Sequence, residues 1–292
     1  MKLSQAIGVI MGANIGTTIT AWILSLTGIE SSNIFVNLLK PSSFAPILAA
    51  IGIVFLMFSK NERKKDIGII FLGFTVLIFG MEMMSGSVAP LADVPEFRNA
   101  LIKFSNPILG MLAGAILTAI IQSSSAAIGI LQALSITGMV NYGVAIPILM
   151  GQNIGTCITA ILSSIGANKN AKRAAAVHLY FNFIATILFM IVFYSINAFV
   201  RFDFLDNSIN AVGIAIIHTL FNIAATIVLL PVSHLLEKLA IITIKDDKEQ
   251  EDKEFKLLDT RFLESPGYAI KLSKEMSDKM AELSRAGYLK AV

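Results

Sequence analysis

Long apolar stretches separated by short polar breaks run along most of the chain, and they predict membrane helices. The first stretch, 3–27, exceeds the ~20 residues that a helix needs to cross hydrocarbon, and it lacks a signal-peptide cleavage site. Five further stretches lie at 44–59, 67–86, 143–166, 174–197 and 209–236. We therefore expect an all-α, polytopic membrane protein.

One apolar stretch does not have the length of a single span. Residues 107–138 carry no charge, but they are too long for one ordinary span and too short for two. A re-entrant helical hairpin fits this length, with 108–121 descending, 126–136 returning and Gln122-Ser123-Ser124-Ser125 at the tip. Re-entrant backbone is tolerated at membrane depth where protein or a wet cavity surrounds it.

The charged segments predict which side of the membrane each loop faces. Basic residues gather at 60–65 and 169–173, and the positive-inside rule places both segments in the cytoplasm. The polar segments 87–106 and 199–208 then face outward, whereas the charged tail after residue 244 is cytoplasmic. We expect a multi-pass protein of the inner membrane with a cytoplasmic C-terminus.

Eleven residues inside the first stretch recur later in the chain. Met11-Gly12-Ala13-Asn14-Ile15-Gly16-Thr17-Thr18-Ile19-Thr20-Ala21 returns 139 residues later as Met150-Gly151-Gln152-Asn153-Ile154-Gly155-Thr156-Cys157-Ile158-Thr159-Ala160. If the hairpin enters and leaves by one face, the first copy runs from inside to outside and the second from outside to inside. A paired polar break in inverted repeats is the sequence pointer to a transporter's binding site.

Composition narrows the class of protein further. Hydrophobic residues make up 55% of the chain, charged residues 15%, and the mean hydropathy is +0.74. The net charge of +3 comes from small basic loops and a mixed tail, which argues against nucleic acid as a partner and leaves the lipid bilayer as the main one. A single cysteine, Cys157, excludes an internal disulfide framework and a cysteine-based metal site.

The hairpin tip offers the groups that an oxyanion needs. Gln122, Ser123, Ser124 and Ser125 supply an amide and three hydroxyls, and the returning helix exposes unpaired N–H groups and the positive end of its dipole. A single serine in a membrane helix more often bonds the preceding turn or a neighbouring helix. Three serines in succession at a kink favour the binding role.

The repeated motif supplies glycines and neutral oxygen atoms. The glycine pairs whose spacing lets two helices touch closely are Gly12/Gly16, Gly110/Gly114 and Gly151/Gly155, and a broken helix at a binding site would need the same missing side chains. Hard cations such as sodium prefer oxygen ligands, including carbonyls freed by unwinding. The candidate sodium ligands belong to Asn14, Thr17, Thr18, Asn153, Thr156 and Thr159.

A second motif occurs twice near the end of the apolar region. His178-x-x-Phe181-Asn182 recurs as His218-x-x-Phe221-Asn222, and each His and Asn lie four residues apart on one helix face. A lone membrane histidine is more often a structural donor between helices. A proton or ion relay is the alternative for His178, Asn182, His218 and Asn222.

Together, these motifs resemble the repeat signature of the type II sodium/phosphate cotransporter family. The Gln-Ser-Ser-Ser hairpin, the Gly-x-Asn-Ile-Gly-Thr motif and the segment from Arg173 to Asn182 follow one another in that family's order, within roughly 1–240. The resemblance implies that Gln122 to Ser125 and the paired Asn/Thr motifs line a phosphate and sodium site. It implies sodium:phosphate symport rather than an enzyme, with sodium as coupling ion and no other cofactor.

The resemblance also predicts the domains. Residues 1–240 form the transmembrane domain, 241–263 a charged linker, and 264–292 the start of a PhoU-like domain. A single amphipathic helix there needs PhoU-like helices or another subunit as its partner. In the family each repeat has its own Gln-Ser-Ser hairpin, and that of the first copy would lie ahead of Met1, so we expect a fragment at both ends.

Two other functions fit parts of the sequence. An intramembrane serine hydrolase would use Ser123, Ser124 or Ser125 as nucleophile and His178 or His218 as base, but no Gly-x-Ser-x-Gly elbow is present. A non-transporting phosphate sensor would signal through the tail. Symport has a physical reason, because no Lys or Arg lies between Pro107 and Gly166 and sodium would balance the phosphate charge.

Overall fold

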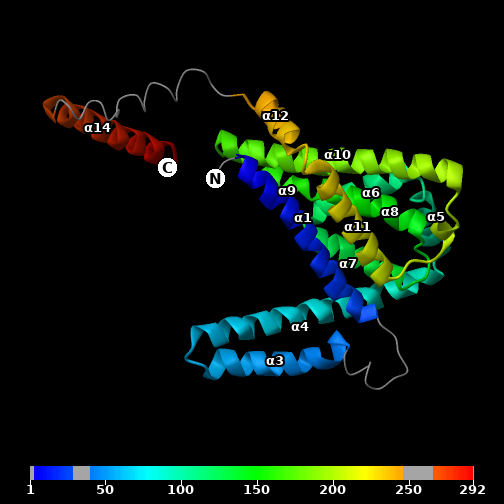
Figure 1. Cartoon of the computed structure of the whole chain (residues 1–292). Coiled ribbons are helices and arrows are strands. Elements are labelled where there is room, and N and C mark those ends of the chain that lie inside the picture. Colours follow the sequence, from blue (N-terminus) through cyan, green and yellow to red (C-terminus); the bar gives the residue numbers. More distant parts are fainter. Residues whose placement is uncertain (1–2, 29–39, 246–265, 292) are drawn as a thin grey trace. The chain divides into compact units, whose positions relative to one another are not determined.

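The computed structural model describes residues 3–28, 40–245 and 266–291, which form helices and connecting turns (Figure 1). The chain divides into two compact units, Met1–Ile244 and Lys245–Val292. The helices of the first unit are α1 (Leu3–Ser25), α3 (Pro41–Phe58), α4 (Glu62–Val88), α5 (Pro95–Lys103), α6 (Pro107–Ile121), α7 (Ser124–Ser135), α8 (Tyr142–Gly155), α9 (Cys157–Ser163), α10 (Lys169–Val200), α11 (Ala211–Leu229) and α12 (Ser233–Thr243). Short 3-10 helices lie at Leu26–Gly28 (η1), Ala89–Asp93 (η2) and Asp203–Asp206 (η3).

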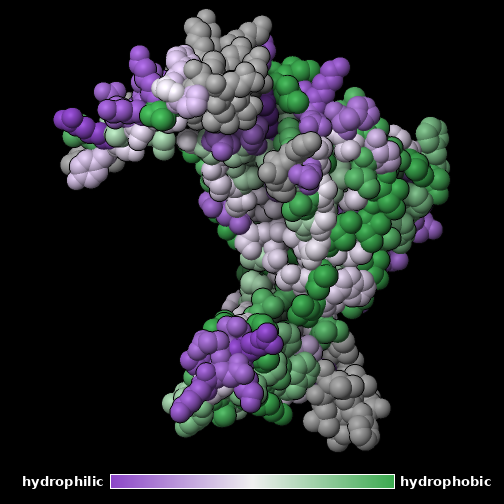
Figure 2. All heavy atoms as spheres, turned by 60° about the vertical axis from the view of Figure 1, so that its left-hand side comes forward, coloured by the Kyte–Doolittle hydropathy of each residue, from purple (hydrophilic) through white to green (hydrophobic). Residues whose placement is uncertain are grey.

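Six helical segments in the described part of the chain are long and apolar enough to cross a membrane. They are Leu3–Ser25, Pro41–Phe58, Glu62–Leu91, Tyr142–Ser163, Lys169–Val200 and Ala211–Leu229. Figure 2 shows the broad hydrophobic surface that these helices present, with hydrophilic residues gathered at the turn between α3 and α4. The prediction of an all-α, polytopic membrane protein is confirmed.

Asparagine side chains mark where many of the helices begin. Asn106 caps α6, Asn141 caps α8, Asn168 caps α10 and Asn210 caps α11, each accepting a hydrogen bond from a backbone N–H in the first turn. Such a cap satisfies an N–H group that has no partner within the helix. These asparagine caps therefore define where the apolar helices of the bundle begin.

Several predicted boundaries were wrong because helices continue into polar segments. The basic residues 62–65 belong to α4 and 169–173 to α10, so neither is a loop. The polar segment 87–106, predicted as a loop, contains η2 and α5. The apolar stretch 209–236 is two helices, because Pro231 lacks a backbone N–H and interrupts it between α11 and α12.

Residues 107–138 form a hairpin of two short helices. The chain turns at Gln122, which adopts a left-handed backbone conformation with φ of 60° and ends α6. α6 starts near α8, where Gly110 approaches Pro147, and beyond α7 the carbonyl of Gly138 accepts a hydrogen bond from Ser208. Since Tyr142 and Ser208 lie at the same end of the bundle, the hairpin enters and leaves there.

The helices that carry the two motif copies run in opposite directions. At the end of α1, Ala21 O accepts a hydrogen bond from Gln132, whose amide also donates to Ala211 O at the start of α11. The start of α8 is tied to the same end, because Tyr142 N donates to Asn207 O just before α11. α1 therefore ends where α8 begins, as expected of inverted repeats.

One buried hydrophobic cluster contains matching residues from both copies. Ile7 and Met11 of α1 share it with Ile146 and Met150 of α8, which stand at the equivalent repeat positions. The cluster also includes Phe181 of α10 and Phe221 of α11. The core of the unit thus forms where the two repeats meet.

The cytoplasmic ends predicted from charge lie on one side of the first unit. The turn between α3 and α4 and the start of α10 both lie on the left in Figure 1. At the start of α10, the buried Arg173 donates two hydrogen bonds to Ile244 O at the end of α12, with distances of 3.0 and 2.8 Å. This contact fixes the last residue of the unit against α10.

The second unit contains one described helix, α14 (Pro266–Ala291). Its residues Met280 and Leu283, which recur at helical spacing, are exposed. Most of the predicted charged linker lies outside the described residues. The PhoU-like character of this segment stays a prediction.

Candidate ion and substrate site

The two motif asparagines occupy equivalent, buried environments. Asn14 on α1 and Asn153 on α8 are each 5% exposed. Asn14 Nδ2 donates to Ile10 O at 3.0 Å, and Asn153 Nδ2 donates to Leu149 O at 3.1 Å, which is the same bond to the preceding turn. Because each amide group is fixed through its nitrogen, its Oδ1 atom is available as an acceptor or cation ligand.

The motif threonines also donate their side-chain hydrogen to a backbone carbonyl of the preceding turn. Thr17 donates to Asn14 O and Thr18 to Ile15 O, while Thr156 donates to Gln152 O and Thr159 to Thr156 O, with distances of 2.7 to 3.0 Å. Each hydroxyl hydrogen is therefore used within its own helix. The oxygen lone pairs remain, and these can accept a hydrogen bond or coordinate a hard cation.

The helices are less broken at the motifs than the sequence suggested. α1 continues without interruption through Gly12 to Thr20, so no carbonyl is freed by unwinding in the first copy. In the second copy Thr156 separates α8 from α9, yet its N–H still donates to Gln152 O at 3.0 Å. A helix tolerates glycine where the packed environment compensates for its flexibility, so the glycines alone do not break these helices.

The glycines of the second copy lie at a close contact between α6 and α8. A Cβ atom at Gly151 would overlap Met111 O, and one at Gly155 would lie 2.7 Å from Thr118 Cβ. Gly110 and Gly114 of α6 face α8 in the same way. Gly12 and Gly16 differ, because a Cβ at either position meets no described atom within 4 Å.

Each motif copy packs against one helix that carries the His-x-x-Phe-Asn motif. Next to the second copy, Asn182 of α10 donates to Cys157 Sγ at 3.5 Å, and Cys157 Sγ donates to His178 O at 3.4 Å. α1 packs against α11, where Trp22 Nε1 donates to Thr219 Oγ1 at 3.0 Å. The structure therefore brings the two kinds of motif together in pairs.

Asn182 and Asn222 repeat the geometry of the motif asparagines. Each Nδ2 donates to the carbonyl of the histidine four residues earlier, His178 or His218, at 3.1 and 2.8 Å. Both asparagines are buried, and His218 is only 2% exposed. In all four buried asparagines the Nδ2 atom is used in a hydrogen bond to the backbone of the same helix, and the Oδ1 atom is not part of that bond.

The hairpin tip has free hydroxyl groups. Ser123 Oγ accepts a hydrogen bond from Ala126 N and caps α7, whereas Ser124 and Ser125 are half-buried and their hydroxyls have no hydrogen bond to another described residue. α6 and α8 run in parallel, and Thr118 lies against Gly155. Because Gln122 follows Thr118 by about one helical turn, the tip lies just beyond this contact.

Several buried polar atoms have no partner among the described residues. They are Thr118 Oγ1, Gln132 Oε1, Gln152 Oε1, Tyr194 Oη, His218 Nδ1 and Asn222 Oδ1. Such atoms are rare in native proteins and usually pair with water or an ion. Sequence reasoning missed Gln132 and gave Gln152 no role, although a glutamine inside an uncharged apolar stretch is the signal that could have found both.

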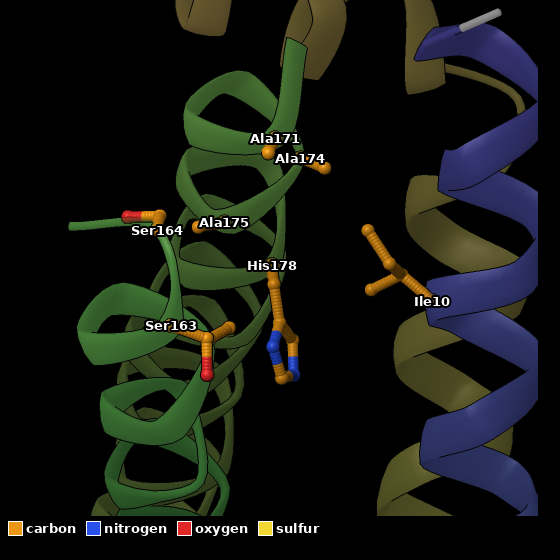
Figure 3. Close-up of a pocket in the computed structure, with 8 residues that line it drawn as sticks. Ile10, Ser163, Ser164, Ala171, Ala174, Ala175 and His178 are labelled. Atoms are coloured by element: carbon orange, nitrogen blue, oxygen red, sulfur yellow. The ribbon is translucent and has the colours of Figure 1, made fainter. Parts of the chain in front are cut away.

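A cavity of about 280 Å³ lies between the two repeats, close to the basic start of α10. It is lined by Ile10 of α1, Ala160 and Ser163 of α9, Ser164, and Ala171, Ala174, Ala175 and His178 of α10. Figure 3 shows His178 and Ser163 on the side of the cavity opposite Ile10. The cavity thus touches the second motif copy through Ala160 and lies beside the start of the first copy through Ile10, the residue before Met11.

The chemistry of the interior is that of neutral oxygen atoms. The described residues contain no group of three His, Cys, Asp or Glu side chains that could hold a metal ion. Inverted helices, buried uncharged oxygens and a re-entrant hairpin are typical of a secondary transporter.

Comparison with known proteins identifies the family. The model of the Na+/Pi-cotransporter family matches residues 1–86 and again 76–223. The chain therefore belongs to the Na+/Pi-cotransporter family, which is a family of transporters and not of enzymes. The twofold match agrees with the internal repeat.

Individual relatives of this chain match it over only part of their length. The chain is 28% identical over 189 residues to the "Uncharacterized protein YqeW" of Bacillus subtilis, covering 64% of this chain and 57% of the relative. It is 25% identical over 191 residues to the "Putative inorganic phosphate export protein YjbB" of Escherichia coli K12, covering 65% and 33%. The human "Sodium-dependent phosphate transport protein 2B" is 36% identical over 100 residues, covering 32% and 14%. The chain thus spans little more than half of the first of these relatives and less of the others, and no solved structure matches it.

Proposed function

We propose that this protein carries inorganic phosphate across the inner membrane together with sodium. The observation that carries the proposal is the pair of uncharged oxygen clusters on antiparallel helices, at Asn14 to Thr18 and Asn153 to Thr159, in which Asn14, Thr18 and Asn153 are buried. Membership in the Na+/Pi-cotransporter family supports phosphate as the substrate and sodium as the coupling ion. The names of the human and bacterial relatives agree with phosphate transport.

Charge balance gives the coupling a physical reason. Residues 107–166, which include the hairpin and the second motif, contain no charged side chain. A phosphate dianion in such a site would lack a fixed counter-charge, and an unpaired buried charge is strongly unfavourable. Sodium ions on the Asn and Thr oxygens would supply the missing positive charge, so phosphate would bind well only after sodium.

The roles of the individual residues follow from their hydrogen bonds. Ser124 and Ser125 would donate to phosphate oxygens, because their hydroxyls have no described protein partner. The N-terminus of α7 would add backbone N–H groups and the positive end of a helix dipole. The cavity beside His178 would connect this site with the cytoplasm.

The sidedness belongs to the same proposal. The basic residues at 60–65 and at the start of α10 lie at one end of the unit, which would be the cytoplasmic end. The C-terminal unit would then lie in the cytoplasm. PhoU-like helices or another subunit would cover the exposed apolar residues of α14.

The direct test is phosphate flux in proteoliposomes. Purified protein is reconstituted, and uptake of radiolabelled phosphate is followed with an inward gradient of sodium or, as the control, of potassium. We expect uptake with sodium only, and loss of uptake in the Asn153→Ala variant. Sodium-dependent phosphate binding without any flux would instead favour the phosphate-sensing role, and equal flux in potassium would contradict sodium coupling.

A further inference from the structure

One side chain connects the second motif copy with the hairpin. Gln152 lies between Gly151 and Asn153 on α8 and is only 2% exposed. Its Nε2 atom donates a hydrogen bond to Ala127 O in the first turn of α7, at 3.1 Å. The equivalent position of the first copy is Ala13, whose side chain has no hydrogen-bond donor. Gln152 therefore makes a contact between two helices that the repeated motif does not require.

The two ends of this contact reach the two proposed binding sites. On α8, the backbone carbonyl of Gln152 accepts hydrogen bonds from Thr156 N at 3.0 Å and from Thr156 Oγ1 at 2.9 Å. On α7, Ala127 N donates to Ser123 O at 3.0 Å, and Ser123 is the N-cap of that helix. A continuous set of hydrogen bonds thus runs from a candidate sodium ligand through Gln152 to the start of α7, where we propose that phosphate binds.

The amide group of Gln152 has a cost that an apolar side chain would not have. Its Oε1 atom is buried and has no hydrogen-bond partner among the described residues. Gln152 lines a cavity of about 150 Å³ whose other lining residues are all apolar, among them Phe97 of α5, Leu117 of α6 and Leu131 of α7. A buried acceptor without a partner is unfavourable, and native proteins keep such exceptions mainly at functional sites. The arrangement favours a functional role for this amide over simple packing.

We propose that Gln152 is a positioning residue that couples sodium binding to phosphate binding. This role rests on the proposed function. By holding Ala127 O, Gln152 keeps the first turn of α7 at a fixed separation from the oxygens of Asn153 and Thr156. The attraction between a sodium ion and a phosphate depends on the distance between them, and it is stronger where water is excluded. A fixed separation therefore increases the factor by which one ligand tightens the binding of the other.

Replacing Gln152 by Met tests the proposal, because Met is also long and unbranched but has no hydrogen-bond donor. Titration calorimetry on the purified protein measures the phosphate Kd at saturating sodium and the sodium Kd without and with phosphate. We expect the sodium Kd without phosphate to equal that of the parent. The phosphate Kd at saturating sodium should rise roughly threefold to tenfold, the scale of one neutral hydrogen bond. The tightening of sodium binding by phosphate should fall by the same factor.

Gln132→Met is the matched control. Gln132 is also buried and donates from Nε2 to two backbone carbonyls, those of Ala21 and Ala211, but it lies at the other end of α7 from the tip. Loss of these hydrogen bonds should lower the melting temperature and leave the factor by which phosphate tightens sodium binding unchanged. Gln152→Ala, which introduces the residue of the first copy, should lose coupling as Gln152→Met does, so the test does not depend on a single variant.

The outcomes distinguish this role from the proposed function. If the parent shows reciprocal tightening and both Gln152 variants keep the full factor, Gln152 does not couple the sites, while the proposed function stands. If the Gln152 variants weaken sodium binding measured alone as much as phosphate binding, the role of Gln152 is structural and the proposal is wrong. A parent protein in which neither ligand tightens the other would overturn the coupling role and the proposed function together.

Discussion

At the scale of single residues, the asparagines and threonines of the motifs share one property, which is that their side-chain donors are used locally. Asn14, Asn153, Asn182 and Asn222 all donate to the carbonyl four residues earlier, and the motif threonines donate within their own helices. What remains toward the interior is a set of acceptor oxygens. That asymmetry suits a cation better than an anion, and it supports our proposal that phosphate binds instead at the serine hydroxyls and helix N-terminus of the hairpin tip.

Replacing Ser124 by Ala should weaken phosphate binding, whereas replacing Ser135 should not. Ser124 is half-buried at the tip, while Ser135 donates to Gln132 O at 2.6 Å within α7. A hydrogen bond to a charged group contributes roughly 1.5–3 kcal/mol, so we expect roughly a tenfold or greater loss of phosphate affinity for Ser124→Ala. Phosphate-induced thermal stabilisation at saturating sodium measures it; equal losses in both variants would indicate a helix-packing role.

At the scale of elements, the contact between α6 and α8 explains why the second motif copy contains glycines. The two helices touch through backbone atoms at Gly151 and Gly155. At the equivalent positions of the first copy, Gly12 and Gly16, an added Cβ atom meets no described atom within 4 Å. The repeated glycine spacing therefore lies in a tight helix contact in the second copy only.

The matched substitutions Gly151→Ala and Gly12→Ala should differ in their effect on the stability of the protein. A methyl group at Gly151 collides with Met111 O, and overpacking of this kind costs about 1–3 kcal/mol. At Gly12 a methyl group meets no described atom within 4 Å. We expect a lower melting temperature for Gly151→Ala only; an equal decrease in both variants would contradict the packing described for α6 and α8.

The helices also show which features of the fold could be predicted from the sequence alone. Length and charge predicted the hairpin at 107–138 and the opposite directions of the motif copies, because membrane thickness limits how apolar stretches can be arranged. Sequence could not reveal that α1 stays helical through Gly12 to Thr20 or that Arg173 is buried against Ile244, since both depend on tertiary packing. The partnerless oxygens of Gln132 and Gln152 likewise become visible only once their amide nitrogens have found backbone carbonyls.

At the scale of the whole molecule, the first unit is two inverted halves that share one core. Ile7 and Met11 meet the same cluster as Ile146 and Met150, and each half pairs its motif helix with one His-x-x-Phe-Asn helix. Such a pseudo-symmetric arrangement allows two surfaces to move about a fixed central site. We expect that alternating access uses the contact between the repeats.

Cysteine accessibility in intact cells tests the sidedness. In the Cys157→Ser background, a membrane-impermeant thiol reagent added outside should label Ser87→Cys, at the end of α4, and Asn207→Cys, before α11. Asn170→Cys, in the first turn of α10, should react only after the cells are opened. The reverse pattern would invert the proposed topology, whereas the inverted relation of the repeats would stand.

The central claim is that neutral oxygens hold sodium and that sodium in turn holds phosphate. Linkage requires the effect to be reciprocal, so phosphate must tighten sodium binding by the factor by which sodium tightens phosphate binding. The most direct measurement is the phosphate Kd of the purified protein at graded sodium, with choline replacing sodium, for the parent chain and for Asn153→Ala and Thr156→Ala. We predict that phosphate binding strengthens steeply with sodium and disappears in choline, and that in both variants the curve shifts to higher sodium while much of the affinity returns at saturation. A phosphate Kd that is the same in sodium and in choline would contradict the account.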